Sequence, residues 1–155
     1  MALCARDIMV KDVFSVTPCM SLVDMDSAFL QRGISGAPVV EGGKLRGVVS
    51  RSDISRKLSE AVQSPGTQEA PRGSLLDLMT AASRNVKPAF ERVRELCVGD
   101  IMVEKVVAVQ PDTSIRSVAS LMVERKIHRV LVVDGEQLVG LVSTLDLVKA
   151  MLVDA

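Results

Sequence analysis

An internal repeat restricts the folds that are open to this chain. The segment "DIMVKDVFSVTP" at Asp7 returns as "DIMVEKVVAVQP" at Asp100, and "GVVSRSD" at Gly47 returns as "GLVSTLD" at Gly140. The offset is 93 residues for both pairs, and 19 of the 50 positions aligned from Asp7 onward are identical. Chains of this composition would share about 3 or 4 by chance. The sequence therefore predicts one structural unit built twice.

Each copy predicts the same order of elements, β-α-β-β-α. A short strand, 13–16 or 106–109, ends near a proline, which cannot donate to a β-ladder. A helix capped by Ser21 or Ser114 follows, then two strands joined by a glycine-containing turn, and a last helix from about Asp53 or Leu145. The helical residues expected to be buried are Leu22, Met25, Phe29, Ile54, Leu58 and Ala61 in the first copy, and Ile115, Val118, Met122, Leu147, Val148 and Met151 in the second.

A unit of about 50 residues is too small to bury a large core alone. We therefore expect an α+β fold in which two β-α-β-β-α repeats pack sheet to sheet about a pseudo-two-fold axis, with two related clefts between them. We assign residues 1–62 to the first repeat, 63–97 to a linker with short amphipathic helices, and 98–155 to the second repeat. A lid, a dimer contact and a simple spacer all remain open for the linker, one helix of which carries Phe90, Val93 and Cys97 on one face.

Composition and motifs argue against several classes of function. The 19 basic and 19 acidic residues give no net charge that would attract nucleic acid or a membrane, and three Phe without Trp or Tyr provide no base-stacking platform. Three cysteines without CxxC spacing fit a reducing compartment, and no 18-residue apolar run is present, so we expect a cytoplasmic protein without membrane insertion. With one histidine, no P-loop and no Gly-x-Ser-x-Gly motif, we expect no enzymatic activity.

A Ser-x-x-Asp motif stands where the last helix of each copy should begin, as Ser50 with Asp53 and as Ser143 with Asp146. This is the spacing of a helix cap, in which the helix dipole favours the carboxylate. It also suits sugar binding, because one carboxylate can accept hydrogen bonds from both ribose hydroxyls. The two interpretations are compatible.

In the second copy, His128 and Arg129 stand at the start of the predicted hairpin. Arginine offers a planar fork to phosphate oxygens, and histidine can add positive charge near neutral pH. The first copy has Ser35 and Gly36 at these positions, although its Arg51 stands where the second copy has Thr144. The two halves therefore differ in charge at this position. The alternative interpretation is that His128 and Arg129 are solvent-exposed residues at the start of a strand and bind no ligand.

Taken together, "DIMV…VTP" with "DIMV…VQP", "GVVSRSD" with "GLVSTLD", and "IHRVLVVD" resemble a tandem pair of cystathionine β-synthase (CBS) domains, or Bateman module. The resemblance covers both repeats, about two-thirds of the chain. It implies a regulatory protein that binds adenine nucleotides in clefts between the repeats and transmits their occupancy to a partner.

The resemblance also implies which residues bind the ligand. The ribose-binding residues would be Ser50, Asp53, Ser143 and Asp146. The adenine-binding residues would be Val16, Thr17, Pro18, Ile34, Ala37, Val109, Gln110, Pro111 and Ile127. The phosphate-binding residues would be His128 and Arg129, to which we add Arg51.

The expected ligand is AMP, ADP or ATP, with S-adenosylmethionine as the alternative, and no metal is required. The expected partners are a second copy of the chain, in a homodimer, and an enzyme or transporter of unknown identity. A second hypothesis is a scaffold that dimerises or docks on a partner without binding a nucleotide.

Overall fold

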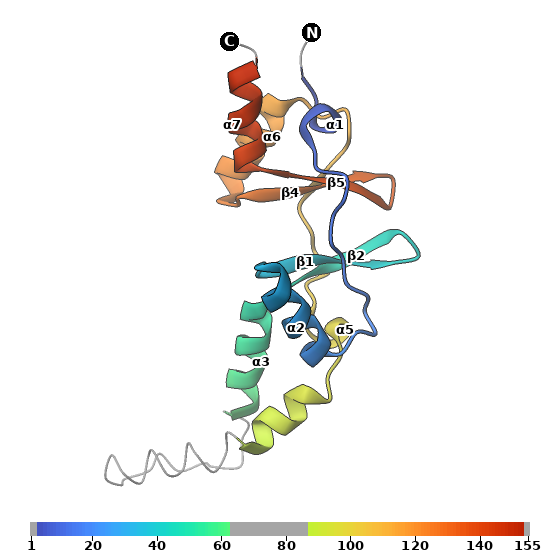
Figure 1. Cartoon of the computed structure of the whole chain (residues 1–155), viewed down its shortest axis with the longest axis vertical. Coiled ribbons are helices and arrows are strands. Elements are labelled where there is room, and N and C mark those ends of the chain that lie inside the picture. The colour runs from blue at the N-terminus through green and yellow to red at the C-terminus, as the bar shows by residue number, and fades with distance from the viewer. Residues whose placement is uncertain (1–2, 63–86, 154–155) are drawn as a thin grey trace, which may run out of the picture. The chain divides into compact units, whose positions relative to one another are not determined.

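The computed structural model of the chain describes residues 3–62 and 87–153, which form helices and short strands of the α+β class (Figure 1). This confirms the predicted class. The elements are α1 (Ala5–Ile8), α2 (Leu22–Arg32), β1 (Gly36–Glu41), β2 (Lys44–Ser50), α3 (Arg51–Val62), α5 (Val98–Ile101), β3 (Ala108–Val109), α6 (Ile115–Arg125), β4 (Arg129–Asp134), β5 (Gln137–Ser143) and α7 (Thr144–Val153). Residues 87–94 are also helical, as predicted for the end of the linker, but this helix ends before Cys97, so the predicted common face of Phe90, Val93 and Cys97 is wrong at Cys97. Residues 63–86 of that linker lie outside the described residues.

The chain divides into two compact units that do not follow the order of the repeats. Unit 1 takes its described residues from Met1–Ser15, Val40–Gly47 and Glu104–Ala155, and unit 2 takes them from Val16–Val39 and Val48–Val103. Helix α1, which opens the first repeat, therefore belongs to the unit of α6 and α7. Helix α5, which opens the second repeat, belongs to the unit of α2 and α3. The two repeats exchange their first segments.

Equivalent backbone hydrogen bonds hold both exchanged segments. In unit 1, the amide of Ala5 donates to the carbonyl of Thr113 over 2.8 Å, and Val10 pairs with Leu141. In unit 2, the amide of Val98 donates to the carbonyl of Met20 over 2.9 Å. Val103 likewise pairs with Val48. Each partner lies 93 positions from its counterpart, so the two units satisfy their backbone groups in the same way.

Helices α2 and α6 have the predicted N-terminal caps. The hydroxyl of Ser21 accepts from the amide of Asp24 at 3.1 Å, and the hydroxyl of Ser114 accepts from the amide of Ser117 at 3.2 Å. Both helices end in a left-handed residue, which is Gly33 in α2 but Lys126 in α6, with φ of 64° and 53°. Glycine adopts this conformation without steric cost and lysine does not.

The strands are hydrogen-bonded in the order β1-β2-β5-β4-β3. Within unit 1, β4 and β5 are antiparallel, β3 is parallel to β4, and the register joins β2 to β5 at Lys44 and Gln137. The predicted strand 106–109 is reduced to the two residues of β3, and the predicted strand 13–16 to one bridge between Val16 and Val39. The pairing of segment 13–16 with β1 is the shorter of the two, because β1 contains Pro38, which has no amide hydrogen to donate.

The core of each unit is mainly aliphatic, and Phe29 adds one buried aromatic ring in unit 2. The predicted buried positions Leu22, Met25, Phe29, Val118 and Met122 are confirmed, and Ile115, Ile54, Leu58, Ala61 and Leu147 are half-buried. The prediction was wrong for Val148 and Met151, which are 48% and 71% exposed. Helix α7 turns Leu147 and Ala150 inward instead. Because α7 is apolar on more than one face, its periodicity does not identify the buried side.

Candidate functional site

In unit 1, the second Ser-x-x-Asp motif caps the N-terminus of α7. The Oδ2 atom of Asp146 accepts from the backbone amide of Ser143 at 2.8 Å and from its hydroxyl at 2.6 Å, and the amide of Asp146 donates back to that hydroxyl at 3.3 Å. The predicted cap is therefore confirmed. Within the described part of the chain, the other carboxylate oxygen, Oδ1, forms no hydrogen bond. One oxygen orients the carboxylate and the other remains able to accept from a ligand.

In unit 2, the first copy of the motif forms the same cap, but its carboxylate is occupied on both sides. Oδ2 of Asp53 accepts from the amide and the hydroxyl of Ser50, both at 2.8 Å, and Oδ1 accepts from Nη2 of Arg56 at 2.9 Å. Burial raises the pKa of Asp53, but the hydrogen bonds from Arg56 and Ser50 outweigh it, so the pKa lies below its ordinary value. A ligand hydroxyl would have to displace Arg56.

The predicted phosphate-binding residues of unit 1, His128 and Arg129, lie beside its Ser-x-x-Asp motif. Arg129 is directly opposite Ser143 in the antiparallel register of β4 and β5, so the two side chains point to the same face. The carbonyl of His128 accepts from the amide of Thr144 at 3.0 Å and from its hydroxyl at 3.2 Å. His128 and Arg129 are exposed. Unit 1 thus has an arginine, a histidine and a capped carboxylate at the end of the β4–β5 hairpin where α7 begins; Figure 1 shows this junction of β5 and α7.

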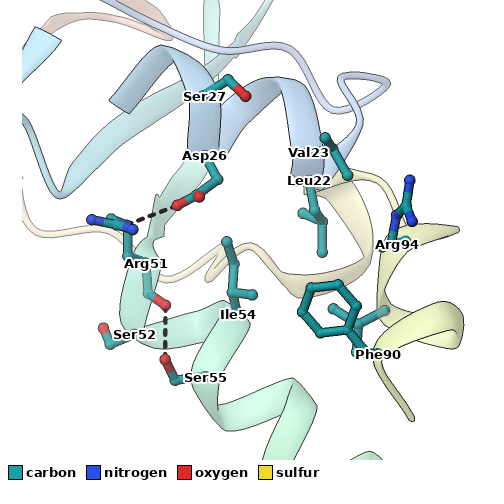
Figure 2. Close-up of a pocket in the computed structure, with 11 residues that line it drawn as sticks. Leu22, Val23, Asp26, Ser27, Arg51, Ser52, Ile54, Ser55, Phe90 and Arg94 are labelled. Atoms are coloured by element: carbon teal, nitrogen blue, oxygen red, sulfur yellow. Dashed lines mark hydrogen bonds and ion pairs between the residues drawn. The ribbon is translucent and has the colours of Figure 1, made fainter. Parts of the chain in front are cut away.

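The corresponding place in unit 2 has the same backbone and different side chains. The amide of Arg51 donates to the carbonyl of Ser35 at 2.9 Å, as Thr144 does to His128. The Nε of Arg51, which we predicted to bind phosphate, instead pairs with Oδ1 of Asp26 in α2 at 2.8 Å (Figure 2). Its role in phosphate binding stays a prediction.

Most of the residues predicted to bind adenine lie elsewhere in each unit. Val109 pairs with Val132, three residues along β4 from Arg129, which is a separation of about 10 Å along the strand. Val109 is buried and Gln110 is exposed. The carbonyl of Pro111 accepts from the amide of Arg6 at 3.0 Å. Within unit 1, the structure therefore gathers the predicted sugar- and phosphate-binding residues but not this adenine-binding segment.

The other predicted adenine-binding residues take part in local structure. Val16 and Ala37 are buried, Thr17 is exposed, and the carbonyl of Pro18 accepts from the amide of Gly99 at 2.9 Å. Ile34 and Ile127 follow the ends of α2 and α6, where their amides donate to Phe29 and Met122, both at 3.0 Å. Of these residues only Ile127 adjoins His128 and Arg129, so the adenine contacts stay predictions.

Sequence reasoning missed two side chains that change the chemistry of unit 2, namely Arg56 and Asp26. The three-residue spacing from Asp53 to Arg56 is a helical ion-pair spacing and could have been recognised. Asp26 and Arg51 are 25 residues apart, and no local pattern indicates that they meet.

Neither a metal centre nor a membrane span is found in the part that the structure describes. No three His, Cys, Asp or Glu side chains gather in residues 3–62 and 87–153 in a way that could hold a metal ion. The helices of the same residues are too short or too polar to cross a bilayer.

Comparisons with known proteins identify the family. The model of the CBS domain matches residues 5–60 and 98–153, and the chain therefore belongs to the CBS domain family, as a tandem pair. A relative named "Uncharacterized protein MJ1426", from Methanocaldococcus jannaschii, is 32% identical over 152 residues, which are 95% of this chain and 90% of that protein. In three other curated relatives the match spans between 23% and 38% of their length.

Two solved structures of CBS pairs show the same fold. That of CBSX2 in complex with AMP, a protein of Arabidopsis thaliana, is 24% identical, with a TM-score of 0.68 and 97% of both chains covered. That of the CBS domain pair of MJ0100, in complex with 5'-methylthioadenosine and S-adenosyl-L-methionine, is 19% identical, with a TM-score of 0.66 and 100% of both chains covered.

Proposed function

We propose that this protein is a ligand-sensing regulatory module that binds an adenine nucleotide (AMP, ADP or ATP) mainly through unit 1. The observation that carries the proposal is the end of the β4–β5 hairpin, where Arg129 faces Ser143 and the cap leaves Oδ1 of Asp146 open. The complex of CBSX2 with AMP supports the choice of ligand class.

The proposed chemistry assigns one task to each group. Oδ1 of Asp146 accepts from the ribose hydroxyls while Ser143 holds Oδ2, so the carboxylate is oriented before the ligand arrives. Hydrogen bonds to a charged group of this kind contribute about 1.5–3 kcal/mol. Arg129 and His128 bind the phosphate, for which a guanidinium fork is suited. The segments at Val16 and Val109 remain the proposed adenine contacts.

Regulation would follow from a population shift. A nucleotide that binds one conformation more tightly than another moves the equilibrium only by that difference in affinity. We propose that a partner enzyme or transporter reads the favoured conformation, and that the module works as a cytoplasmic homodimer. Within the described residues, Cys4, Cys19 and Cys97 are not joined by disulfides, which fits a reducing compartment.

Two alternatives have observations in their favour. The ligands of MJ0100 favour S-adenosylmethionine, but its sulfonium would add a positive charge next to Arg129. The exposed apolar side chains of α7 favour an interaction scaffold without nucleotide; they are Leu145, Val148, Met151 and Leu152.

Isothermal titration calorimetry of the full chain with AMP, ATP, adenosine and S-adenosylmethionine separates these functions. We expect AMP or ATP to bind more tightly than adenosine, because only they engage Arg129. Tighter binding of S-adenosylmethionine would favour that ligand, and no binding of any of the four would favour the scaffold.

A further inference from the structure

Unit 2 contains a pocket that the proposed nucleotide site does not explain. It lies between α2, α3 and the helical residues 87–94, and its volume is about 630 Å³ (Figure 2). Pockets for small molecules in proteins span about 300–1,000 Å³. Of all the residues predicted to bind the nucleotide, only Arg51 lines it.

The walls of the pocket are mainly apolar. Leu22 and Val93 line it as nearly buried side chains, 3% and 6% exposed, and Ile54 projects into it from α3 (Figure 2). The ring of Phe90 closes one side although it is 54% exposed. An exposed aromatic ring at the wall of a concave apolar surface is a typical contact for a ligand, because covering it removes a large apolar area from water.

The charges around the pocket do not cancel. Asp26 and Arg51 pair with each other at 2.8 Å on one side. Arg94 lies across the pocket from that pair in Figure 2, and within the described residues it forms no ion pair. The lining therefore carries one net positive charge beside an apolar interior.

Residues 87–94 lie outside both repeats. Phe90, Val93 and Arg94 consequently have no equivalents among the repeated positions, so the repeat does not generate a second pocket of this kind in unit 1. Within the described residues, this pocket therefore belongs to unit 2, where the proposed nucleotide site is less well equipped.

We propose that this pocket is a second ligand site, which binds a small organic carboxylate with an apolar body. The apolar part would pack against Ile54, Phe90 and Val93, and the carboxylate would pair with Arg94 at the rim. A lone phosphate fits less well, because it would leave the apolar walls uncovered. The site would make unit 2 respond to a ligand other than the nucleotide of unit 1.

The test is a titration of the full chain with octanoate, in which the amide chemical shifts of the protein are measured by two-dimensional NMR. 1-Octanol, which has the same chain length and no charge, is titrated for comparison. We expect saturable shifts in residues 22–27, 51–55 and 90–94. The substitution Arg94→Gln should weaken octanoate binding about three- to five-fold, as for an exposed ion pair, and leave 1-octanol unchanged. Phe90→Ala should weaken both probes.

The control is Arg92→Gln, because Arg92 is an exposed arginine of the same helix that does not line the pocket. It should bind octanoate like the unchanged protein. The proposal is overturned if octanoate does not saturate, if its shifts gather on α7, or if Arg94→Gln and Arg92→Gln have equal effects. Nucleotide binding takes no part in this readout, so the two proposals fail separately.

Discussion

The N-termini of α7 in unit 1 and α3 in unit 2 form the same backbone hydrogen bond, but the charged side chains beside them differ. The amide of Thr144 donates to the carbonyl of His128, and the amide of Arg51 donates to that of Ser35, at 3.0 and 2.9 Å. Next to these hydrogen bonds, unit 1 exposes His128 and Arg129, whereas in unit 2 Arg51 pairs with Asp26. Duplication has kept the bonds that build the fold, while the exposed side chains that determine chemistry have diverged.

The two caps differ in the same way. Asp146 retains an oxygen without a partner in the described residues, whereas both oxygens of Asp53 are occupied, one of them by Arg56. The same motif therefore serves as a cap in both units, but only in unit 1 is it also ready to accept from a ligand.

The largest expected effect is on nucleotide affinity. Asp146→Ala should weaken AMP binding about ten- to a hundred-fold, because it removes a charged hydrogen-bond acceptor worth about 1.5–3 kcal/mol. The matched change Asp53→Ala should weaken it less than about three-fold, because Arg56 already occupies that carboxylate. Calorimetry measures both constants. Equal losses in the two variants would remove the difference between the units.

The second effect separates phosphate from sugar. Arg129→Ala should weaken AMP and ATP about ten-fold and leave adenosine within about two-fold, because its guanidinium acts on the phosphate. The same titrations provide the measurement. A uniform loss for all three ligands would show that Arg129 does not contact the phosphate.

The third effect is a pH dependence of stability that belongs to unit 2. The pKa of Asp53 is lowered in the folded state, so its ionised form stabilises the protein above the ordinary carboxyl pKa of about 3.9. That contribution is lost as the pH falls through the lowered pKa. Arg56→Gln should therefore reduce the free energy of unfolding at neutral pH, and the deficit should disappear in acid. Urea unfolding at a series of pH values measures this.

The control for that experiment is Lys149→Gln, at the position of unit 1 equivalent to Arg56. Lys149 is exposed and forms no ion pair within the described residues, so its replacement should leave the pH profile unchanged. An identical profile change in both variants would argue against a specific effect of Arg56 on Asp53.

The smallest effect compares the ends of α2 and α6. Gly33→Ala should destabilise the protein by about 1 kcal/mol, because alanine is strained at a φ of 64°. Lys126→Gly should stabilise it by up to about 1 kcal/mol for the converse reason, since Lys126 has a φ of 53°. Urea midpoints at neutral pH measure both. Changes of the same sign would mean that side-chain contacts, not backbone strain, dominate at these positions.

Local features of the fold were predictable from the sequence. The capping hydroxyls of Ser21 and Ser114, the buried faces of α2 and α6 and the turns at Gly42 and Gly135 depend on neighbouring residues, so spacing and residue type suffice. The Ser-x-x-Asp caps were recognised for the same reason.

Long-range features were not predictable. Both copies begin with "DIMV", so nothing local indicates that α1 packs with the second repeat and α5 with the first. The Asp26–Arg51 pair and the pocket beside Phe90 depend on contacts between distant segments. Which side of α7 is buried also depends on its neighbours, because several of its faces are apolar.

The central claim is that unit 1 holds the nucleotide, and amide chemical shifts during an AMP titration test it most directly. We predict that the earliest saturable changes occur at His128, Arg129 and residues 143–146, before any change at Ser35, Gly36 or residues 50–53. Changes confined to the positions of unit 2, or none in either unit, would contradict it.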